Sequence, residues 1–293
     1  MKPFDVHQPE SVDDALRLLR LFGPSARALA GGTDLLLENR SGLDSPDHLV
    51  SLTGVKGLLF ITEDSHGLRI GATTTLMLIE NSPLVRRRCE MLAEAAGMIG
   101  ARQTRNLATL GGNVCNAVPS ADTAPPLLAS DAEAIAVSLE GRRRIPMAEF
   151  FLAPRSTTLQ PGELLEAIVI PLPAPHSGCT YVRHTARKAL DLAIVGVAVR
   201  IALDSAGDTV LEARVALGAV APTPIRARDA EALLIGQAPT DRLFELAAEA
   251  AVGAARPISD LRASADYRSE MIRTLTRRCL GESLHRAQGQ SDG

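Results

Sequence analysis

The sequence contains no tryptophan and only two tyrosines, so aromatic residues make up 3% of its 293 residues. Proteins that bind single-stranded nucleic acid stack bases on aromatic side chains, and this chain has few of them. Positive charge is not in excess either, because 31 Lys and Arg face 34 Asp and Glu. A nucleic-acid-binding protein is therefore not expected.

The four cysteines, at positions 89, 115, 179 and 279, are few, and they form no CxxC pair. Zinc sites and all-cysteine iron–sulfur clusters use closely spaced cysteines, so we expect no metal site on this chain. The longest apolar run, Leu192 to Val199, is too short to cross a bilayer. The N-terminus lacks the apolar core of a signal peptide, so a cytoplasmic protein is expected.

At about 150 residues per domain, the length indicates two domains. The proline-rich segment from Pro171 to Gly178 marks the boundary between them. In the first part, Ser11 is expected to cap a helix that runs to Phe22. Short strands are predicted over 26–30, 48–52, 58–62, 68–71, 132–139 and 164–170, and a longer helix over 83–98. Residues 100–126 show no clear period and predict a long loop.

Beyond the boundary the pattern changes to two long strands followed by helices. Paired strands are predicted over 193–203 and 210–217, and helices over 229–234, 242–255 and 265–279. Residues 286–293 are polar and are expected to fray. This half is predicted to be α+β, with a small sheet backed by helices.

A Gly-Gly turn follows the strand predicted over 26–30, in the segment Ala30-Gly31-Gly32-Thr33-Asp34. Glycines let a backbone approach a ligand closely, and the N–H groups at a helix start donate to anionic oxygens. The segment lacks GxGxxG spacing and a Walker lysine. A tight turn with a capping threonine explains the same residues equally well.

A second Gly-Gly pair, Gly111-Gly112, stands among the possible donors Thr109, Asn113 and Asn116. Two such turns could grip a pyrophosphate from two sides, with a dinucleotide between subdomains of the first half. Two ordinary loops remain the alternative. Cys115, beside this turn, is interpreted as a small buried residue rather than a redox thiol.

Charged residues follow in two further segments. Asp122 either accepts hydrogen bonds from a ribose or caps the next helix, and chemistry alone favours the cap. Arg183 and Arg187 lie just after the boundary, ahead of an apolar strand and near Asp191. Their charge could stabilise an anionic reduced cofactor. The alternative is a solvated strand edge.

Taken together, these segments resemble the FAD-binding (medium) subunit of the molybdenum hydroxylases, the family of carbon monoxide dehydrogenase and xanthine dehydrogenase. Asp122 stands in the place of the family's nucleotide-contacting acid. The family often has Lys where this chain has Arg183, which keeps the charge. The segments that resemble the family span almost the whole chain: Phe4 to Leu16, Ala30 to Asp34, Arg105 to Asn113, Ser120 to Pro125, and Arg187 to Val195, the last like the family's loop near the flavin ring.

The resemblance implies a vanillyl-alcohol-oxidase (PCMH)-type FAD-binding domain of two α/β subdomains over residues 1–173. The family's flavoprotein C-terminal domain would follow over 177–285. FAD would be bound non-covalently, and no side chain would be catalytic. The implied FAD-binding residues are Ala30, Gly31, Gly32, Thr33, Asp34, Thr109, Gly111, Gly112, Asn113, Asp122, Arg183, Arg187 and Asp191.

The resemblance also implies an oxidoreductase complex. A large partner subunit with a molybdenum cofactor would hydroxylate a substrate, and a small partner subunit would relay electrons through [2Fe–2S] clusters. FAD on this chain would pass them to NAD, a quinone or another acceptor, and two heterotrimers would form a dimer. Two other functions stay open: a stand-alone FAD-dependent oxidase or dehydrogenase of the same fold, and a non-enzymatic nucleotide-binding assembly module.

Overall fold

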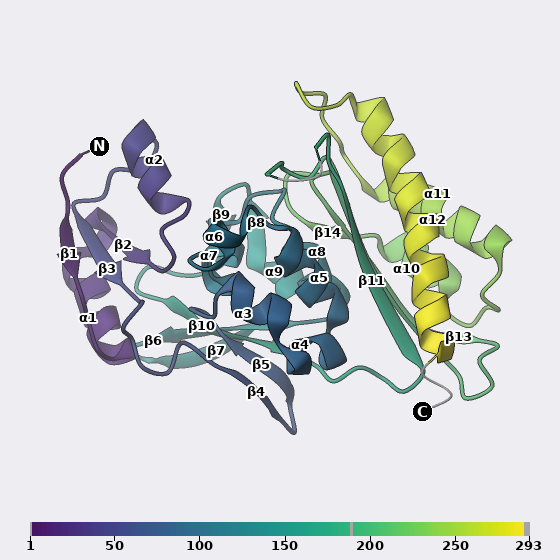
Figure 1. Cartoon of the computed structure of the whole chain (residues 1–293), viewed down its shortest axis with the longest axis horizontal. Helices are drawn as coiled ribbons and strands as arrows, with labels where there is room; N and C mark the ends of the chain where they lie inside the picture. Colours follow the sequence, from purple (N-terminus) through teal and green to yellow (C-terminus); the bar gives the residue numbers. More distant parts are fainter. Residues whose placement is uncertain (1, 188–189, 290–293) are drawn as a thin grey trace.

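The chain forms three larger sheets in a row, each with helices packed against it (Figure 1). The computed structural model describes residues 2–187 and 190–289. The N-terminus lies by the first sheet, at the left of Figure 1, and the last helices cover the third sheet at the right. This mixture of sheets and separate helices confirms the predicted α+β class.

The first sheet and its helices are built from residues 5–51. They comprise β1 (Asp5–His7), α1 (Val12–Phe22), the 3-10 turn η1 (Gly23–Ser25), β2 (Ala26–Leu29), α2 (Leu35–Ser41) and β3 (His48–Ser51). The strands run parallel in the order β1-β3-β2. As predicted, Ser11 caps α1 by accepting a hydrogen bond from the N–H of Asp14 at 3.1 Å.

The second sheet is antiparallel, and short helices cover one of its faces. Its strands are β4 (Ile61–Asp64), β5 (Gly67–Gly71), β10 (Leu164–Ile170), β6 (Glu133–Ser138) and β7 (Gly141–Pro146), in that spatial order, and β8 (Phe151–Ala153) pairs with β9 (Ser156–Thr157) apart from them. Alternate residues of neighbouring strands, such as Ile70, Ala136 and Ile168, enter one core with these helices. The predicted strand over 58–62 is partly wrong, because β4 begins only at Ile61.

The helix predicted over 83–98 is broken in two. The helices of this region are α3 (Leu76–Asn81), α4 (Pro83–Arg88) and α5 (Glu90–Met98). Cys89 separates α4 from α5 with a non-helical backbone (φ −155°, ψ 68°), and its thiol lies 3.3 Å from the hydroxyl of Ser130. No glycine or proline stands at the break, so the helical spacing of apolar residues continues across it and predicts a single helix.

The loop predicted over 100–126 is also wrong, because it contains helices. They are α6 (Arg102–Arg105) and α7 (Leu110–Asn116), with α8 (Ala124–Ala129) at its end, and α9 (Met147–Phe150) follows further on. Each spans two turns or less, which is too short for a helical period to emerge in a sequence. The segment is compact all the same, because α8 is buried throughout and α7 buries Leu110, Gly111 and Val114.

The third sheet is antiparallel and lies between the helices of the first half and the last helices of the chain (Figure 1). It comprises β11 (Ser177–His184), β12 (Val195–Leu203), β13 (Val210–Gly218) and β14 (Ile225–Arg226), with α10 (Arg228–Leu234), α11 (Asp241–Ala254) and α12 (Ala265–Gly289). Val197 and Val199 pack toward α10–α12, whereas Tyr181, Ala198 and Ala216 pack into the core of the first half. Because successive side chains of a strand point to opposite faces, this one sheet contributes to both cores.

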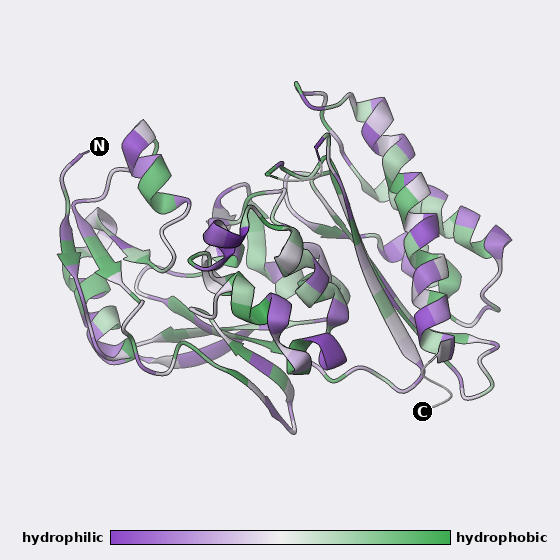
Figure 2. Ribbon diagram, viewed as in Figure 1, coloured by the Kyte–Doolittle hydropathy of each residue, from purple (hydrophilic) through white to green (hydrophobic). Residues whose placement is uncertain are grey.

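Helix α12 is ten residues longer than predicted, and residues 286–289 are helical rather than frayed. Arg286 holds this end by donating to Glu94 at 2.9 Å and to the carbonyl of Cys179 at 2.8 Å. In Figure 2, α11 and α12 carry both green and purple stretches, as expected for helices with one packed and one solvated face. Within the described ranges, no helix is long and apolar enough to cross a membrane.

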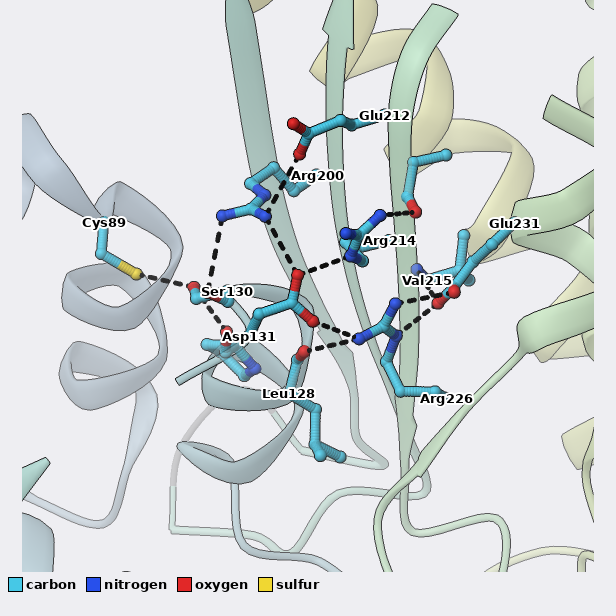
Figure 3. Close-up of polar contacts among 12 residues, drawn as sticks. Cys89, Leu128, Ser130, Asp131, Arg200, Glu212, Arg214, Val215, Arg226 and Glu231 are labelled. Carbon is cyan, nitrogen blue, oxygen red and sulfur yellow. Dashed lines mark hydrogen bonds and ion pairs between the residues drawn. The ribbon is translucent and has the colours of Figure 1, made fainter. Parts of the chain in front are cut away.

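One carboxylate of the first half binds three arginines of the third sheet (Figure 3). Asp131 follows α8 and accepts from Arg214 at 2.6 Å, Arg226 at 2.7 Å and Arg200 at 3.4 Å. Burial raises the pKa of Asp131, but hydrogen bonds and charge from Arg214 and Arg226 outweigh it and leave the pKa below its usual value. Arg226 is also paired with Glu231. This cluster fixes the two halves against each other.

Candidate functional site

A cavity of about 640 Å³ lies where the loop after β2, helix α7 and the end of β11 meet. Its volume is within the range of small-molecule and cofactor sites. Every predicted site residue except Arg187 lines it, namely Ala30, Gly31, Gly32, Thr33, Asp34, Thr109, Gly111, Gly112, Asn113, Asp122, Arg183 and Asp191. The Arg187 side chain is 75% exposed and pairs with Asp191 at 3.7 Å.

The backbone of the first Gly-Gly turn packs directly against the backbone of the segment that precedes the second turn. A Cβ on Gly31 would lie 2.0 Å from the carbonyl oxygen of Leu107, so only glycine permits this approach. Gly32 adopts a positive φ of 68°, which favours glycine. In the described part of the chain, the N–H groups of Gly31, Gly32 and Thr33 have no hydrogen-bond acceptor. They are therefore available to an anion in the cavity.

Thr33 does not cap α2, so that interpretation is wrong. The N-cap of α2 is Asp34, and no side-chain hydrogen bond is made there. Burial and the negative charge of Glu38 raise the pKa of Asp34, although a hydrogen bond from Asn116 and the charge of Arg155 oppose this.

The second Gly-Gly turn differs from the first because its backbone donors are used within the protein. The N–H of Gly111 donates to Ala72 at 2.9 Å, and the N–H of Gly112 donates to the hydroxyl of Thr109 at 3.0 Å. A Cβ on Gly111 would lie 2.7 Å from the carbonyl oxygen of Ala72. A Cβ on Gly112 would meet only the Thr109 hydroxyl within 4 Å. Gly112 therefore presents bare backbone to the cavity.

Asp122 does not cap the following helix, contrary to the interpretation that chemistry alone favours. The N-cap of α8 is Thr123, and it makes no side-chain capping bond. Instead, Asp122 accepts from the Tyr181 hydroxyl at 2.7 Å and from Arg183 at 2.8 Å. Burial raises the pKa of Asp122, and these two donors oppose the rise. Nor does Arg183 lie on a solvated strand edge, because its side chain is buried, whereas the exposed side chain of Arg187 fits that alternative.

Two residues that the sequence analysis missed also line the cavity. Arg155, in the turn between β8 and β9, forms an ion pair with Glu38 of α2. The backbone N–H of Arg155 donates to the carbonyl of Ala117 at 2.9 Å, just after α7. This pair links helix α2 to the β8–β9 hairpin. Its members are 117 residues apart in the chain, so no local motif could reveal it.

The thiol of Cys115 faces the same cavity. Burial raises its pKa to about 12, so the thiol is protonated at neutral pH. It therefore behaves as a small apolar residue and not as a nucleophile.

Two family models cover nearly the whole chain. The FAD binding domain in molybdopterin dehydrogenase matches residues 2–173, and the CO dehydrogenase flavoprotein C-terminal domain matches residues 180–283. The chain belongs to the FAD-binding medium subunits of the molybdenum hydroxylase family. The resemblance described from the sequence is thereby confirmed.

Relatives and solved structures agree with this family. The carbon monoxide dehydrogenase medium chain of Hydrogenophaga pseudoflava is 35% identical and covers 97% of this chain and 98% of its own. A putative xanthine dehydrogenase FAD-binding subunit of Escherichia coli is 34% identical over 97% of each chain. The structure of the Hydrogenophaga enzyme lacking the Mo-pyranopterin moiety of its molybdenum cofactor superposes with a TM-score of 0.93, at 35% identity over 97% of this chain and 98% of that chain. The structure of quinoline 2-oxidoreductase from Pseudomonas putida 86 superposes with a TM-score of 0.89, at 29% identity over 98% of each chain.

The cavity of this family member fits the diphosphate of FAD. The N–H groups of the first turn have no acceptor among residues 2–187 and 190–289, and the bare backbone of Gly112 leaves room opposite them. Asn113 contributes its side-chain amide to the lining, and its oxygen is held by the Thr123 hydroxyl at 2.6 Å. A diphosphate would thus be bound mainly by neutral donors, as at a helix start.

Proposed function

We propose that this chain binds FAD non-covalently in the cavity and passes electrons from a partner iron–sulfur subunit to an external acceptor such as NAD or a quinone. The observation that most directly supports this proposal is that the predicted residues, which come from separate segments of the chain, line one cavity. In this proposal, Ala30–Asp34, Thr109, Gly111, Gly112 and Asn113 surround the diphosphate, and Asp122 accepts from the nucleotide. Arg183, Arg187 and Asp191 belong to the flavin end. Bound FAD supplies the redox chemistry that side chains lack.

The partners follow from the same family. The relatives are named as a medium chain and as an FAD-binding subunit, which implies further subunits in each complex. We propose a large subunit with a molybdenum cofactor, a small subunit with [2Fe–2S] clusters, and a dimer of two such heterotrimers in the cytoplasm. Within this chain, residues 1–173 are proposed as the FAD-binding domain and residues 177–285 as the C-terminal domain.

The first experiment is a visible absorption spectrum of the purified chain, before and after FAD is added. Flavin bands close to 1:1 stoichiometry are expected, and the released cofactor should be FAD. No bound flavin after reconstitution would favour an assembly module. Oxidation of an organic substrate by the isolated chain would favour a stand-alone oxidase.

Asp122→Ala is expected to weaken FAD binding roughly tenfold to hundredfold, the range for loss of a hydrogen bond to a charged group. Titration of flavin fluorescence gives the dissociation constant, and thermal unfolding without FAD reports on the fold. Asp208→Ala is the matched control, because Asp208 is exposed in the turn between β12 and β13. An unchanged dissociation constant in Asp122→Ala would remove Asp122 from the site.

A further inference from the structure

Asp122 is held in place by a strand of the other half of the molecule. Its carboxylate is 7% exposed, with one oxygen accepting from the Tyr181 hydroxyl at 2.7 Å and the other from Arg183 at 2.8 Å. Tyr181 and Arg183 are two residues apart on β11, so their side chains project from the same face of that strand. Both donors therefore come from beyond the FAD-binding family match, which ends at residue 173.

Tyr181 is fixed at both ends. Its side chain lies in the core of the first half, and its backbone N–H donates to Glu94 of α5 at 3.3 Å. On the neighbouring strand, Gly196 leaves space for the phenol, because a Cβ there would lie 2.9 Å from the Tyr181 hydroxyl oxygen. The hydroxyl thus has one position, and in that position it points at Asp122.

The two donors leave Asp122 with lone pairs that can still accept hydrogen bonds. A carboxylate oxygen has two lone pairs, and each oxygen of Asp122 uses one of them within the protein. The others can accept from a ligand hydroxyl in the cavity that Asp122 lines. Donation to both oxygens also favours the charged carboxylate against its burial. The Tyr181 hydroxyl stays protonated, because burial and the Asp122 charge raise its pKa well above the usual value.

We propose that Tyr181 is a positioning residue of the FAD site, which orients the Asp122 carboxylate toward the nucleotide and makes FAD affinity depend on strand β11. This inference rests on the proposed function, because it requires Asp122 to contact FAD. Arg183 acts in the same way on the second oxygen. Tyr181 itself does not line the cavity and touches the ligand only through Asp122.

Tyr181→Phe in the full chain is expected to raise the dissociation constant for FAD about tenfold, because the Asp122 carboxylate loses a donor that orients it while the buried ring is kept. Tyr267→Phe is the matched control. Tyr267 is the other tyrosine of the sequence, and its hydroxyl lies 2.9 Å from Nε2 of His184 and not near Asp122. Its loss is expected to change the dissociation constant less than twofold.

A double-mutant cycle separates positioning from a general loss of structure. In the Asp122→Ala background, Tyr181→Phe is expected to have no further effect on FAD binding. If Asp122→Ala does not fold, Asp122→Asn replaces it, and there the Tyr181→Phe effect should fall to about threefold because the acceptor is neutral.

Two results would overturn the inference. One is wild-type FAD affinity in Tyr181→Phe while Asp122→Ala binds weakly, which leaves the proposed function intact. The other is an equal loss from Tyr181→Phe with and without Asp122, which indicates a structural role only. If neither variant binds FAD less tightly, the proposed site itself is wrong.

Discussion

A purified Gly112→Val chain is expected to contain no FAD while unfolding as cooperatively as the wild type. Within 4 Å, the new Cβ meets only the Thr109 hydroxyl, at 3.0 Å, so the branched side chain occupies the cavity and not the protein core. Displacing that hydroxyl from its cap at the start of α7 lowers stability by about 1 kcal/mol. The ratio of flavin to protein absorbance after FAD addition, together with thermal unfolding, measures both effects.

The neighbouring glycines provide the contrast. Gly111→Ala and Gly31→Ala place a Cβ 2.7 Å and 2.0 Å from backbone carbonyl oxygens, so both should destabilise the fold. Any loss of FAD from these two variants should accompany that loss of stability. Gly253→Val is the matched control on α11, where a Cβ meets nothing within 4 Å, and it should retain FAD. Full flavin content in Gly112→Val would contradict the placement of the diphosphate at this turn.

Asp131→Ala is expected to lower the free energy of unfolding by about 2 kcal/mol. Breaking a buried pair costs about 3–5 kcal/mol, and the Asp131 side chain is 39% exposed, so solvent screening reduces that figure. Three arginines of the third sheet lose their shared carboxylate in this variant. Urea unfolding gives the change, and Glu140→Ala, which removes an exposed pair with Arg20, should change stability by less than about 0.5 kcal/mol.

The stability difference between the wild type and Asp131→Ala should depend on pH. The pKa of Asp131 is lowered in the folded chain, so its contribution is present above the ordinary carboxyl pKa of about 4 and is lost as the pH falls through the folded value. The difference in the free energy of unfolding between the two proteins should therefore be constant from pH 6 to 8. It should shrink toward zero in acid, below about pH 4. A difference that persists unchanged into strong acid would show that Asp131 acts through packing and not through its charge.

The sequence predicts those features that a short segment defines. The cap at Ser11, the long strand predicted over 193–203 and found over Val195–Leu203, and both glycine turns could be read locally, and the structure brings the turns into one cavity. The partners of Asp122 and Asp131 could not be predicted, because they lie 59 to 95 residues away in the chain. The break at Cys89 was hidden for another reason. Tertiary packing, not a local helix breaker, interrupts the helix there.

The placement of the third sheet between two sets of helices has a consequence for synthesis on the ribosome. Helices α5 and α8 emerge long before the strands that later cover them, which are β11 for α5 and β12 and β13 for α8. Until then the apolar surface that meets Ala198 and Ala216 stays open to water or to other chains. The nascent first half therefore exposes apolar surface that the third sheet buries in the complete chain.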